Sequence, residues 1–237
     1  YIIIFMNKKK RIPWSFGGNI PKKFENHIKN SIPYYLEGHR IINKLSDFFL
    51  FDNSICYDLG CSTGNLLIKL ANFTNKKEIK FNGLEIEKKM YSLAKENIKK
   101  NKIKNIKIHN TDIKKVRLKK NNLIISYYTI QFIHPSHRQK VFDKIFKSLN
   151  WGGAFIMFEK VRGNDARFDN IINSLYFDFK EENKFIPKEI LNKSRSLRGV
   201  MEPFSDSGNL GLLKRAGFKD IQTIFHHLCF KGYLCIK

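Results

Sequence analysis

The sequence has no long apolar run. None of its hydrophobic segments approaches the roughly 18–20 residues that a membrane-spanning helix needs. Residues 1–6 are apolar, but this stretch is too brief for a secretory signal, and its basic residues, 8–11, follow the apolar part instead of preceding it. We therefore expect a cytoplasmic protein whose natural start is Met6 and whose residues 1–5 carry no function.

Cysteine is scarce, and none of the cysteines forms a C-x-x-C pair. The chain has four, at Cys56, Cys61, Cys229 and Cys235. His226-His227 precedes Cys229 without a second ligand pair at a suitable spacing, so we expect neither a zinc site nor another metal. Free, partly buried thiols in a reducing compartment are the simplest interpretation.

Acidic residues are few relative to basic ones, 21 against 44, so the net charge is +23. A charge of this size is typical of proteins that bind nucleic acid. Lysine, however, is spread through almost every segment together with Asn and Ile, which is what the codon usage of an AT-rich genome produces. No aromatic and basic RNA-binding motif accompanies the lysine runs. Both explanations stay open, so tRNA is a candidate partner that the sequence does not require.

The most informative segment that is present is the loop Asp58-x-Gly60-x-x-x-Gly64. It follows an apolar run at 54–57 and precedes a helical pattern at 65–70. Strand, glycine loop and helix open a nucleotide-binding βαβ unit, in which glycines let the backbone approach a ligand. The spacing is shorter than the dinucleotide fingerprint and resembles that of S-adenosylmethionine (SAM) methyltransferases. We expect Asp58 and this loop to bind SAM.

Strand-like and helical patterns alternate after this loop. The expected strands are 54–57, 80–85, 106–110, 122–128, 154–158, 221–225 and 233–236, and the expected helices are 34–49, 65–70, 90–100, 138–149 and 210–214. The alternation predicts an α/β fold with a doubly wound, seven-stranded, mostly parallel sheet. No helix separates the last two strands, which predicts an antiparallel C-terminal hairpin.

The domain organisation follows from the same patterns. Residues 1–50 are interpreted as an N-terminal helical cap and residues 51–237 as a Rossmann-like SAM-binding methyltransferase domain. Within that domain, residues 161–205 are polar and helical in pattern, and we interpret them as a helical insertion. Residues 150–153, which contain two glycines, are expected to stop the preceding helix.

Ligands of such sheets bind beyond the carboxyl ends of the strands. Glu85 ends the second strand and is expected to accept the two ribose hydroxyls of adenosine, although a solvated loop acid is the alternative. Asp112, after the third strand, is a candidate acceptor for the adenine amino group with Ile113 offering its backbone N–H, or else an ordinary turn residue. Tyr127, at the end of the fourth strand, either faces the pocket or is a core aromatic.

No catalytic residue emerges from the sequence. There is no arrangement that indicates a nucleophilic triad or a pair of catalytic carboxylates. His134 and His137 flank Pro135-Ser136 in an expected loop and could act as bases, but surface histidines are the more common finding. The catalytic residues are therefore unknown at this stage.

Further segments match one known family in a single order from residue 14 to the C-terminus. They are Trp14-Ser15-Phe16, Ser31-Ile32-Pro33-Tyr34-Tyr35, Tyr57-Asp58-Leu59-Gly60-Cys61-Ser62, Thr129-Ile130-Gln131-Phe132, Arg138-Gln139, Asp143-Lys144-Ile145, Leu149-Asn150-x-Gly152-Gly153-Ala154, Glu159-Lys160, Asp178-Phe179-Lys180, Val200-Met201 and Ala216-Gly217-Phe218. In these segments the sequence resembles the carboxy-S-adenosyl-L-methionine synthases, a family within the class I SAM-dependent methyltransferases.

The resemblance implies an enzyme that converts SAM to carboxy-SAM with prephenate as the carboxyl source, for the modification of wobble uridines in tRNA. It also implies a homodimer and a set of binding residues. Tyr35, Gly60, Cys61 and Ser62 would contact the methionine part of SAM or carboxy-SAM, Glu85 and Ile86 the ribose, and Asp112 and Ile113 the adenine.

Two departures from the family pattern bear on the reaction. The family has Asn where this chain has Tyr127. Its Lys-Arg motif, whose arginine contacts the added carboxylate, becomes Lys193-Ser194-Arg195, which leaves Arg195 and Arg198 as candidate replacements. If neither replaces it, the chain is a SAM-dependent methyltransferase acting on a small molecule or on RNA. A non-catalytic RNA-binding module is a third, weaker reading, because every cofactor position looks usable.

Overall fold

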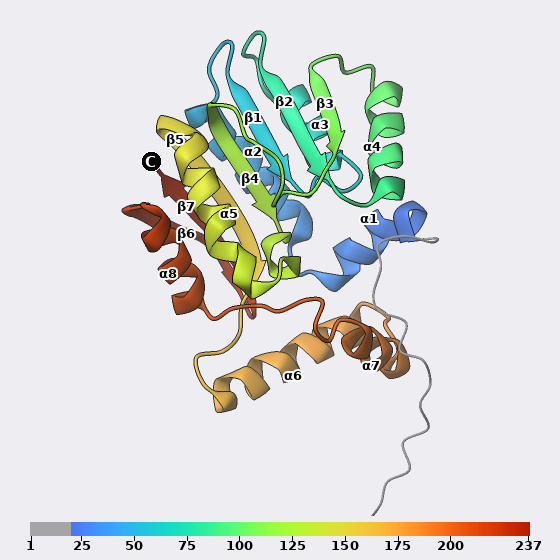
Figure 1. Ribbon diagram of the computed structural model, residues 1–237. Helices are drawn as coiled ribbons and strands as arrows, with labels where there is room; N and C mark the ends of the chain where they lie inside the picture. Colours follow the sequence, from blue (N-terminus) through green and yellow to red (C-terminus); the bar gives the residue numbers. More distant parts are fainter. Residues whose placement is uncertain (1–19) are drawn as a thin grey trace, which may run out of the picture.

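The computed structural model describes residues 20–237, with side chains from Phe24 onward, and centres on one seven-stranded sheet (Figure 1). The strand order is β3-β2-β1-β4-β5-β7-β6. Strands β1 to β5 are parallel, and β7 runs antiparallel to both β5 and β6. The strands are β1 (Ile55–Leu59), β2 (Lys80–Glu85), β3 (Ile106–Asn110), β4 (Asn121–Tyr127), β5 (Leu149–Lys160), β6 (Asp220–His227) and β7 (Phe230–Ile236). The predicted fold class is confirmed.

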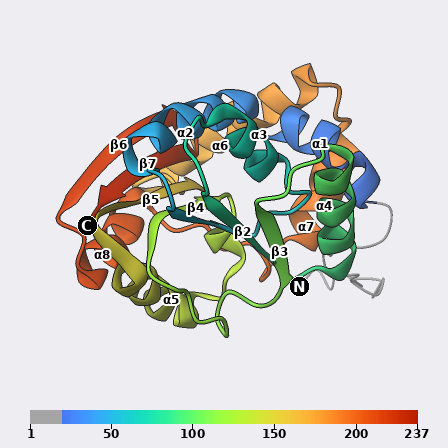
Figure 2. The same cartoon turned by 90° about the horizontal axis from the view of Figure 1, so that it is seen from above.

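Helices cover both faces of the sheet (Figure 2). The helices α2 (Tyr35–Phe49), α3 (Asn65–Phe73) and α4 (Lys88–Lys100) pack on one face. The helices α5 (Pro135–Ser148) and α8 (Asp206–Ala216) pack on the other. Among the described residues, no helix combines the length and the apolar character that crossing a bilayer requires.

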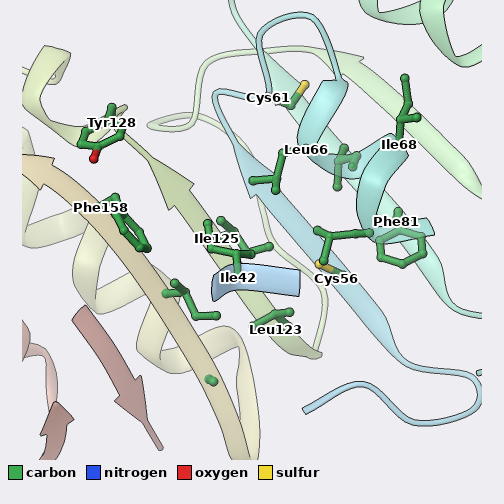
Figure 3. Packing of buried hydrophobic residues seen from close by; sticks show 14 of the residues in the cluster. Ile42, Cys56, Cys61, Leu66, Ile68, Phe81, Leu123, Ile125, Tyr128 and Phe158 are labelled. Atoms are coloured by element: carbon green, nitrogen blue, oxygen red, sulfur yellow. The ribbon is translucent and has the colours of Figure 1, made fainter. Parts of the chain in front are cut away.

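The central strands alternate between the two cores. Leu123 and Ile125 of β4 lie in the core shared with Ile42 of α2, whereas Ile124 between them belongs to the core on the opposite face (Figure 3). Because both faces are covered, such strands read as continuous apolar runs instead of alternating with polar residues. The four cysteines are free and buried within these two cores.

Three helices lie beyond the carboxyl ends of the parallel strands (Figure 1). They are α1 (Ile20–Ser31), α6 (Ala166–Glu182) and α7 (Pro187–Ser196). The segment 161–205 leaves and rejoins the domain at one place, because Arg162 and Ser205 form a parallel β-bridge. The predicted start at Met6, the segment Trp14-Ser15-Phe16 and most of the predicted cap before α1 lie outside the described residues.

The segment after α5 differs from the prediction. The glycines at 152 and 153 do not stop a helix; α5 ends at Ser148, and β5 begins at once with Leu149. The pairing of β4 with β5 shifts register here, and Gly152 takes φ 73°, so the strand bulges. The bulge is held from the chain's end: Gly152 N donates to Lys237 O at 2.8 Å, and Lys237 N donates to Gly153 O at 3.0 Å. The local sequence pattern cannot predict this feature, because it depends on pairing with Lys237, more than 80 residues away in the chain.

Candidate cofactor and substrate site

The glycine loop presents backbone at the carboxyl end of β1. Gly60 and Gly64 have φ values of 77° and 75°, in the left-handed region that favours glycine. A Cβ on Gly60 would come within 2.5 Å of the Thr129 side chain. Gly60 N and Cys61 N donate to Leu84 O at 2.8 and 3.0 Å, which ties the loop to β2. The loop therefore has a fixed shape that only glycine permits.

Glu85 braces this loop from the end of β2. Its Oε2 accepts from Ser62 N and its Oε1 from Glu87 N, both at 2.8 Å. Burial raises the pKa of Glu85, and the backbone N–H donors partly offset that effect. A carboxylate has about four acceptor positions, so each oxygen keeps capacity for a further donor. The arrangement suits the predicted contact with two ribose hydroxyls.

Asp58 is buried in β1, the strand next to the one that ends at Glu85. Burial, and then the charge of Glu85, raises the pKa of Asp58 to about 7. Burial, followed by the charges of Asp58 and Glu85, also raises the pKa of the Cys61 thiol well above its usual value. Cys61 is therefore a protonated thiol at neutral pH and is unsuited to act as a nucleophile.

The loop after β3 is held by the partly buried ammonium group of Lys144. Asp112 Oδ1 accepts from Lys114 N at 2.8 Å, and Lys144 Nζ donates to the carbonyls of Ile113, Lys114 and Val116 at 2.8–2.9 Å. Asp112 also forms an ion pair with Lys114 Nζ at 3.3 Å. The backbone next to the predicted adenine position is thus fixed without a ligand.

Tyr127, at the end of β4, replaces the family asparagine and fills a gap left by a glycine. Its hydroxyl donates to Tyr35 O at 2.5 Å, and its ring lies 5.1 Å from the Tyr35 ring. A Cβ on Gly38 would overlap the Tyr127 hydroxyl. Gly38 and Tyr127 therefore form a matched pair that joins α2 to the end of β4.

A cluster of lysines lies on the other side of β4. Lys180 Nζ of α6 sits 4.0 Å from the centre of the Tyr176 ring, and Lys160 Nζ at the end of β5 sits 4.7 Å from it. Tyr176 is fixed because its hydroxyl donates to Ser31 O at 2.7 Å. Burial, followed by the charges of Lys160 and Lys193, lowers the pKa of Lys180 to about 7. Burial alone lowers the pKa of Lys193 to about 8.

One cavity of about 950 Å³ joins these groups. Every predicted cofactor-binding residue lines it: Tyr35, Asp58, Gly60, Cys61, Ser62, Glu85, Ile86, Asp112, Ile113 and Tyr127. Lys160, Lys180 and Lys193 line it as well. The volume lies within the range of ordinary small-molecule sites, roughly 300–1,000 Å³. The cavity thus carries acids on the β1 to β3 side and cations on the β5 side.

A buried hydrogen-bond network positions Lys160. Glu159 accepts from Ile130 N and Gln131 N at 2.9 and 2.7 Å, and Gln131 Oε1 accepts from Lys160 N at 2.8 Å. Burial raises the pKa of Glu159 to about 8 although these N–H donors oppose the shift. The two family-matching segments Thr129-Ile130-Gln131-Phe132 and Glu159-Lys160 are therefore hydrogen-bonded to each other and join the 3₁₀ turn η1 (Ile130–Phe132) to β5.

The two candidate histidine bases are exposed, as expected of surface residues, but their setting differs from the predicted loop. His134 caps the N-terminus of α5, where its side chain accepts from Ser136 N, and His137 lies inside that helix. Only His134 of the two borders the cavity. Within residues 20–237, no group of three or more His, Cys, Asp or Glu side chains could hold a metal ion.

Known proteins are similar to this chain in sequence. The methyltransferase domain family matches residues 50–217. A carboxy-S-adenosyl-L-methionine synthase of Staphylococcus epidermidis is 36% identical over 227 residues, covering 94% of this chain and 97% of its own. A synthase of the same name from Campylobacter lari is 30% identical and covers 94% of each chain. The chain belongs to the carboxy-S-adenosyl-L-methionine synthase family. It is therefore a SAM-using enzyme of the methyltransferase class.

Solved structures agree on the fold. A SAM-dependent methyltransferase from Aquifex aeolicus has a TM-score of 0.60 at 16% identity and covers 91% of this chain and 97% of its own. A putative SAM-dependent methyltransferase from Methanococcus maripaludis has a TM-score of 0.61 at 19% identity and covers 95% of both chains. At these identities the likeness concerns the fold alone.

The altered arginine motif of the family lies at the cavity. Ser194, in the arginine position, lines it, and so does Arg198. Arg195 is exposed and is not among the residues that line it. Of the two candidate replacements, the structure brings only Arg198 to the site. Lys160 and Lys180 were not predicted as site residues; their presence in the matching Glu159-Lys160 and Asp178-Phe179-Lys180 segments was the available signal.

Proposed function

We propose that this enzyme makes carboxy-SAM by transferring the ring carboxyl group of prephenate to the methyl carbon of SAM. The methyl carbon loses a proton, prephenate loses its ring hydroxyl and becomes phenylpyruvate, and the proton and hydroxide leave as water. One observation carries the proposal: a single cavity has acidic groups at one end and a lysine pair at the other. A plain methyl transfer needs no cationic site for a second substrate, whereas a dicarboxylate donor does.

The acidic end fits SAM. Gly60 leaves backbone open where a side chain would clash, and Glu85 keeps free acceptor positions beside the loop. Asp112 and Ile113 would face the adenine, and Tyr35, Cys61 and Ser62 the methionine part. When bound, SAM supplies a methyl group whose C–H bonds are made acidic by the adjacent sulfonium, so that its carbon can exchange a proton for the carboxyl group. The protein's part is to bind it, orient it and exclude water.

The cationic end fits a carboxylate donor. Lys160 and Lys180 converge on the ring of Tyr176, and neither forms an ion pair with a carboxylate of residues 20–237. Two ammonium groups held this close repel each other, and a bound anion relieves that repulsion. Strands are spaced about 4.8 Å apart, so the ends of β2 and β5, three strands apart, are separated by about 14 Å. Donor and cofactor can therefore occupy the cavity together, and their positioning supplies the rate enhancement.

A SAM-dependent methyltransferase is the second candidate, and Ser194 favours it. The serine lines the cavity where the resemblance places the family's carboxylate-binding arginine, and Arg195 is not among the lining residues. Ser194→Arg separates the two candidates. A carboxy-SAM synthase should keep or improve its kcat/KM for prephenate, because the guanidinium adds a two-pronged carboxylate partner. Ser92→Arg, on the exposed side of α4, is the matched control.

Mass spectrometry of the small molecule that co-purifies with the enzyme tests the main proposal. We expect carboxy-SAM, and we expect added SAM and prephenate to yield more of it. Recovery of SAM alone, with no turnover after prephenate is added, would leave the methyltransferase candidate.

We further propose a homodimer. Several large apolar side chains of α6 and α7 are exposed: Phe168, Ile171, Leu175, Phe177 and Leu191. An apolar face of this kind is typical of a protein–protein contact. Sedimentation velocity should give twice the chain mass; a monomer at micromolar concentration would contradict the proposal.

The proposed product serves tRNA modification in the cytoplasm, but its synthesis needs no contact with tRNA. We therefore propose that the +23 charge is not an RNA-binding surface. The affinity for tRNA, measured over a salt series, should be weak at physiological salt. A steep decrease of a high affinity with salt would instead indicate a surface that contacts several phosphates.

A further inference from the structure

His39, in the second turn of α2, is a buried histidine of the cavity wall to which neither the sequence nor the family resemblance gives a role. It is 2% exposed. Its ring packs against two aromatic rings, with the centroid 4.8 Å from Tyr35 and 4.9 Å from Tyr127. Those two rings are themselves 5.1 Å apart, so the three rings form a triangle, and the His39 ring cannot turn away without breaking both contacts.

The protonation of the ring follows from its one polar partner. His39 Nδ1 lies 3.1 Å from Lys69 Nζ of α3. An ammonium group can only donate, so Nδ1 accepts and the single proton of the neutral ring is on Nε2. Burial and then the charge of Lys69 lower the pKa of His39 to about 3, which keeps the ring neutral.

The Nε2–H of His39 has no hydrogen-bond acceptor within the part of the chain that the structure describes. Buried donors are nearly always paired, so this unpaired donor, on a side chain that lines the cavity, indicates an acceptor that arrives with a ligand. Nε2 itself is covered in this structure, so a ligand reaches it through a small shift of the surrounding side chains. Lys69 adds positive charge behind the ring, which favours an anionic acceptor. By the family resemblance Tyr35 contacts the methionine part of SAM, and Tyr35 packs directly against His39, so we assign this wall to the methionine end of the cavity.

We propose that His39 donates a hydrogen bond from Nε2 to the α-carboxylate of the methionine part of SAM, and that Lys69 fixes the tautomer that makes this bond possible. The proposal rests on the use of SAM and holds for either acceptor chemistry, so a failure of carboxyl transfer leaves it untouched. His39 is a binding residue in this account. The hydrogen bond to the carboxylate satisfies the otherwise unpaired Nε2–H of His39 and fixes the orientation of the bound cofactor.

Isothermal titration calorimetry with two ligands tests this contact. SAM carries the α-carboxylate, and decarboxylated SAM lacks only that group. His39→Phe should weaken SAM binding about tenfold, or about 1.4 kcal/mol, and leave the affinity for decarboxylated SAM within twofold. His39→Gln, which keeps a donor near the Nε2 position, should retain most of the SAM affinity.

His109→Phe is the control for replacing a histidine by an aromatic ring. His109 lies in β3, bonded to Asn82 at 3.1 Å and away from the cavity, so this variant should bind both ligands normally. Equal losses for SAM and decarboxylated SAM in His39→Phe would show a purely structural role and overturn the proposal.

A measurement on the unaltered enzyme covers the case in which the variants do not fold. Long-range proton–nitrogen NMR of the enzyme with labelled histidine should show a neutral His39 ring protonated at Nε2. The Nε2 proton should shift strongly with SAM and little with decarboxylated SAM. A ring protonated at Nδ1, or the same shift with both ligands, would contradict the proposal.

Discussion

The two ends of the cavity are built on different principles. At the acidic end, Glu85 and Asp112 accept hydrogen bonds from backbone N–H groups, which partly compensate their charges before a ligand arrives, although burial and the charge of Glu85 still raise the pKa of Asp58. At the cationic end, Lys160 and Lys180 share one aromatic ring, and burial followed by the charge of Lys160 lowers the pKa of Lys180. We propose that the first end is preformed to bind the neutral ribose and adenine. The second is strained electrostatically until an anion binds.

This difference implies that mutations can impair the function of one end of the cavity without impairing that of the other. Residues of the cationic end should control the donor's kinetic constants, and residues of the acidic end should control cofactor affinity. A variant that changes both in parallel would break the distinction.

The largest effect is expected for Lys160→Met combined with Lys180→Met. Charge-assisted hydrogen bonds contribute about 1.5–3 kcal/mol each, so kcat/KM for prephenate should fall at least about 100-fold. The Kd for SAM should stay within about threefold by calorimetry. Lys188→Met, on the exposed surface of α7, is the control and should be indistinguishable from the wild type.

Glu85→Gln should have the opposite signature. Its amide cannot accept at both positions, so the affinity for SAM should fall about tenfold while the KM for prephenate at saturating SAM is unchanged. Glu96→Gln, which changes an exposed residue paired with Lys100 on α4, is the matched control. An unaltered SAM affinity in Glu85→Gln would remove this residue from the cofactor site.

The pH dependence should sharpen the comparison. Lys180 is charged below its lowered pKa of about 7, so affinity for an anionic donor is greatest below that pH and is lost as the pH rises through it. We expect kcat/KM for prephenate to fall about fivefold or more from pH 6 to pH 9. Lys180→Arg should flatten the profile, because arginine stays charged. Asp58 titrates in the same range, but its effect is common to both proteins. Identical pH profiles for the wild type and Lys180→Arg would contradict the assignment of Lys180 as the group that binds the anionic donor.

The smallest effects separate the two candidate arginines. Arg198 lines the cavity but is exposed, so Arg198→Met should raise the KM for prephenate about threefold. Arg195 does not line the cavity, so Arg195→Met should change it less than about twofold. The reverse order would require a local rearrangement of α7 when the donor binds.

The same contrast explains what the sequence could reveal. The acidic end depends on short segments, a strand followed by Asp58, Gly60 and Gly64, and on Glu85 at the end of the next strand, so its residues are recognisable from local patterns. The cationic end joins β5 to α6 and α7, and only the fold brings Lys160 and Lys180 to the same ring.

The features that could not be predicted from the sequence depend on contacts between residues far apart in the chain. The strands were recognisable because their apolar runs are covered on both faces, whereas the start of β5 depends on pairing with Lys237 at the chain's end. The exchange of the family asparagine for Tyr127 was visible in the sequence. Its compensation by Gly38 was not, because it requires the position of α2. His39 gave no sequence signal, since its significance lies in an unpaired atom.

The central claim is that one cavity holds SAM at its acidic end and a carboxyl donor at its cationic end. The most direct measurement incubates the enzyme with SAM and with prephenate isotopically labelled at its carboxyl carbons, and identifies the nucleoside product by mass spectrometry. The account predicts labelled carboxy-SAM, formed by the wild type and nearly abolished by Lys160→Met with Lys180→Met. Unchanged SAM from a folded, SAM-binding enzyme would contradict it.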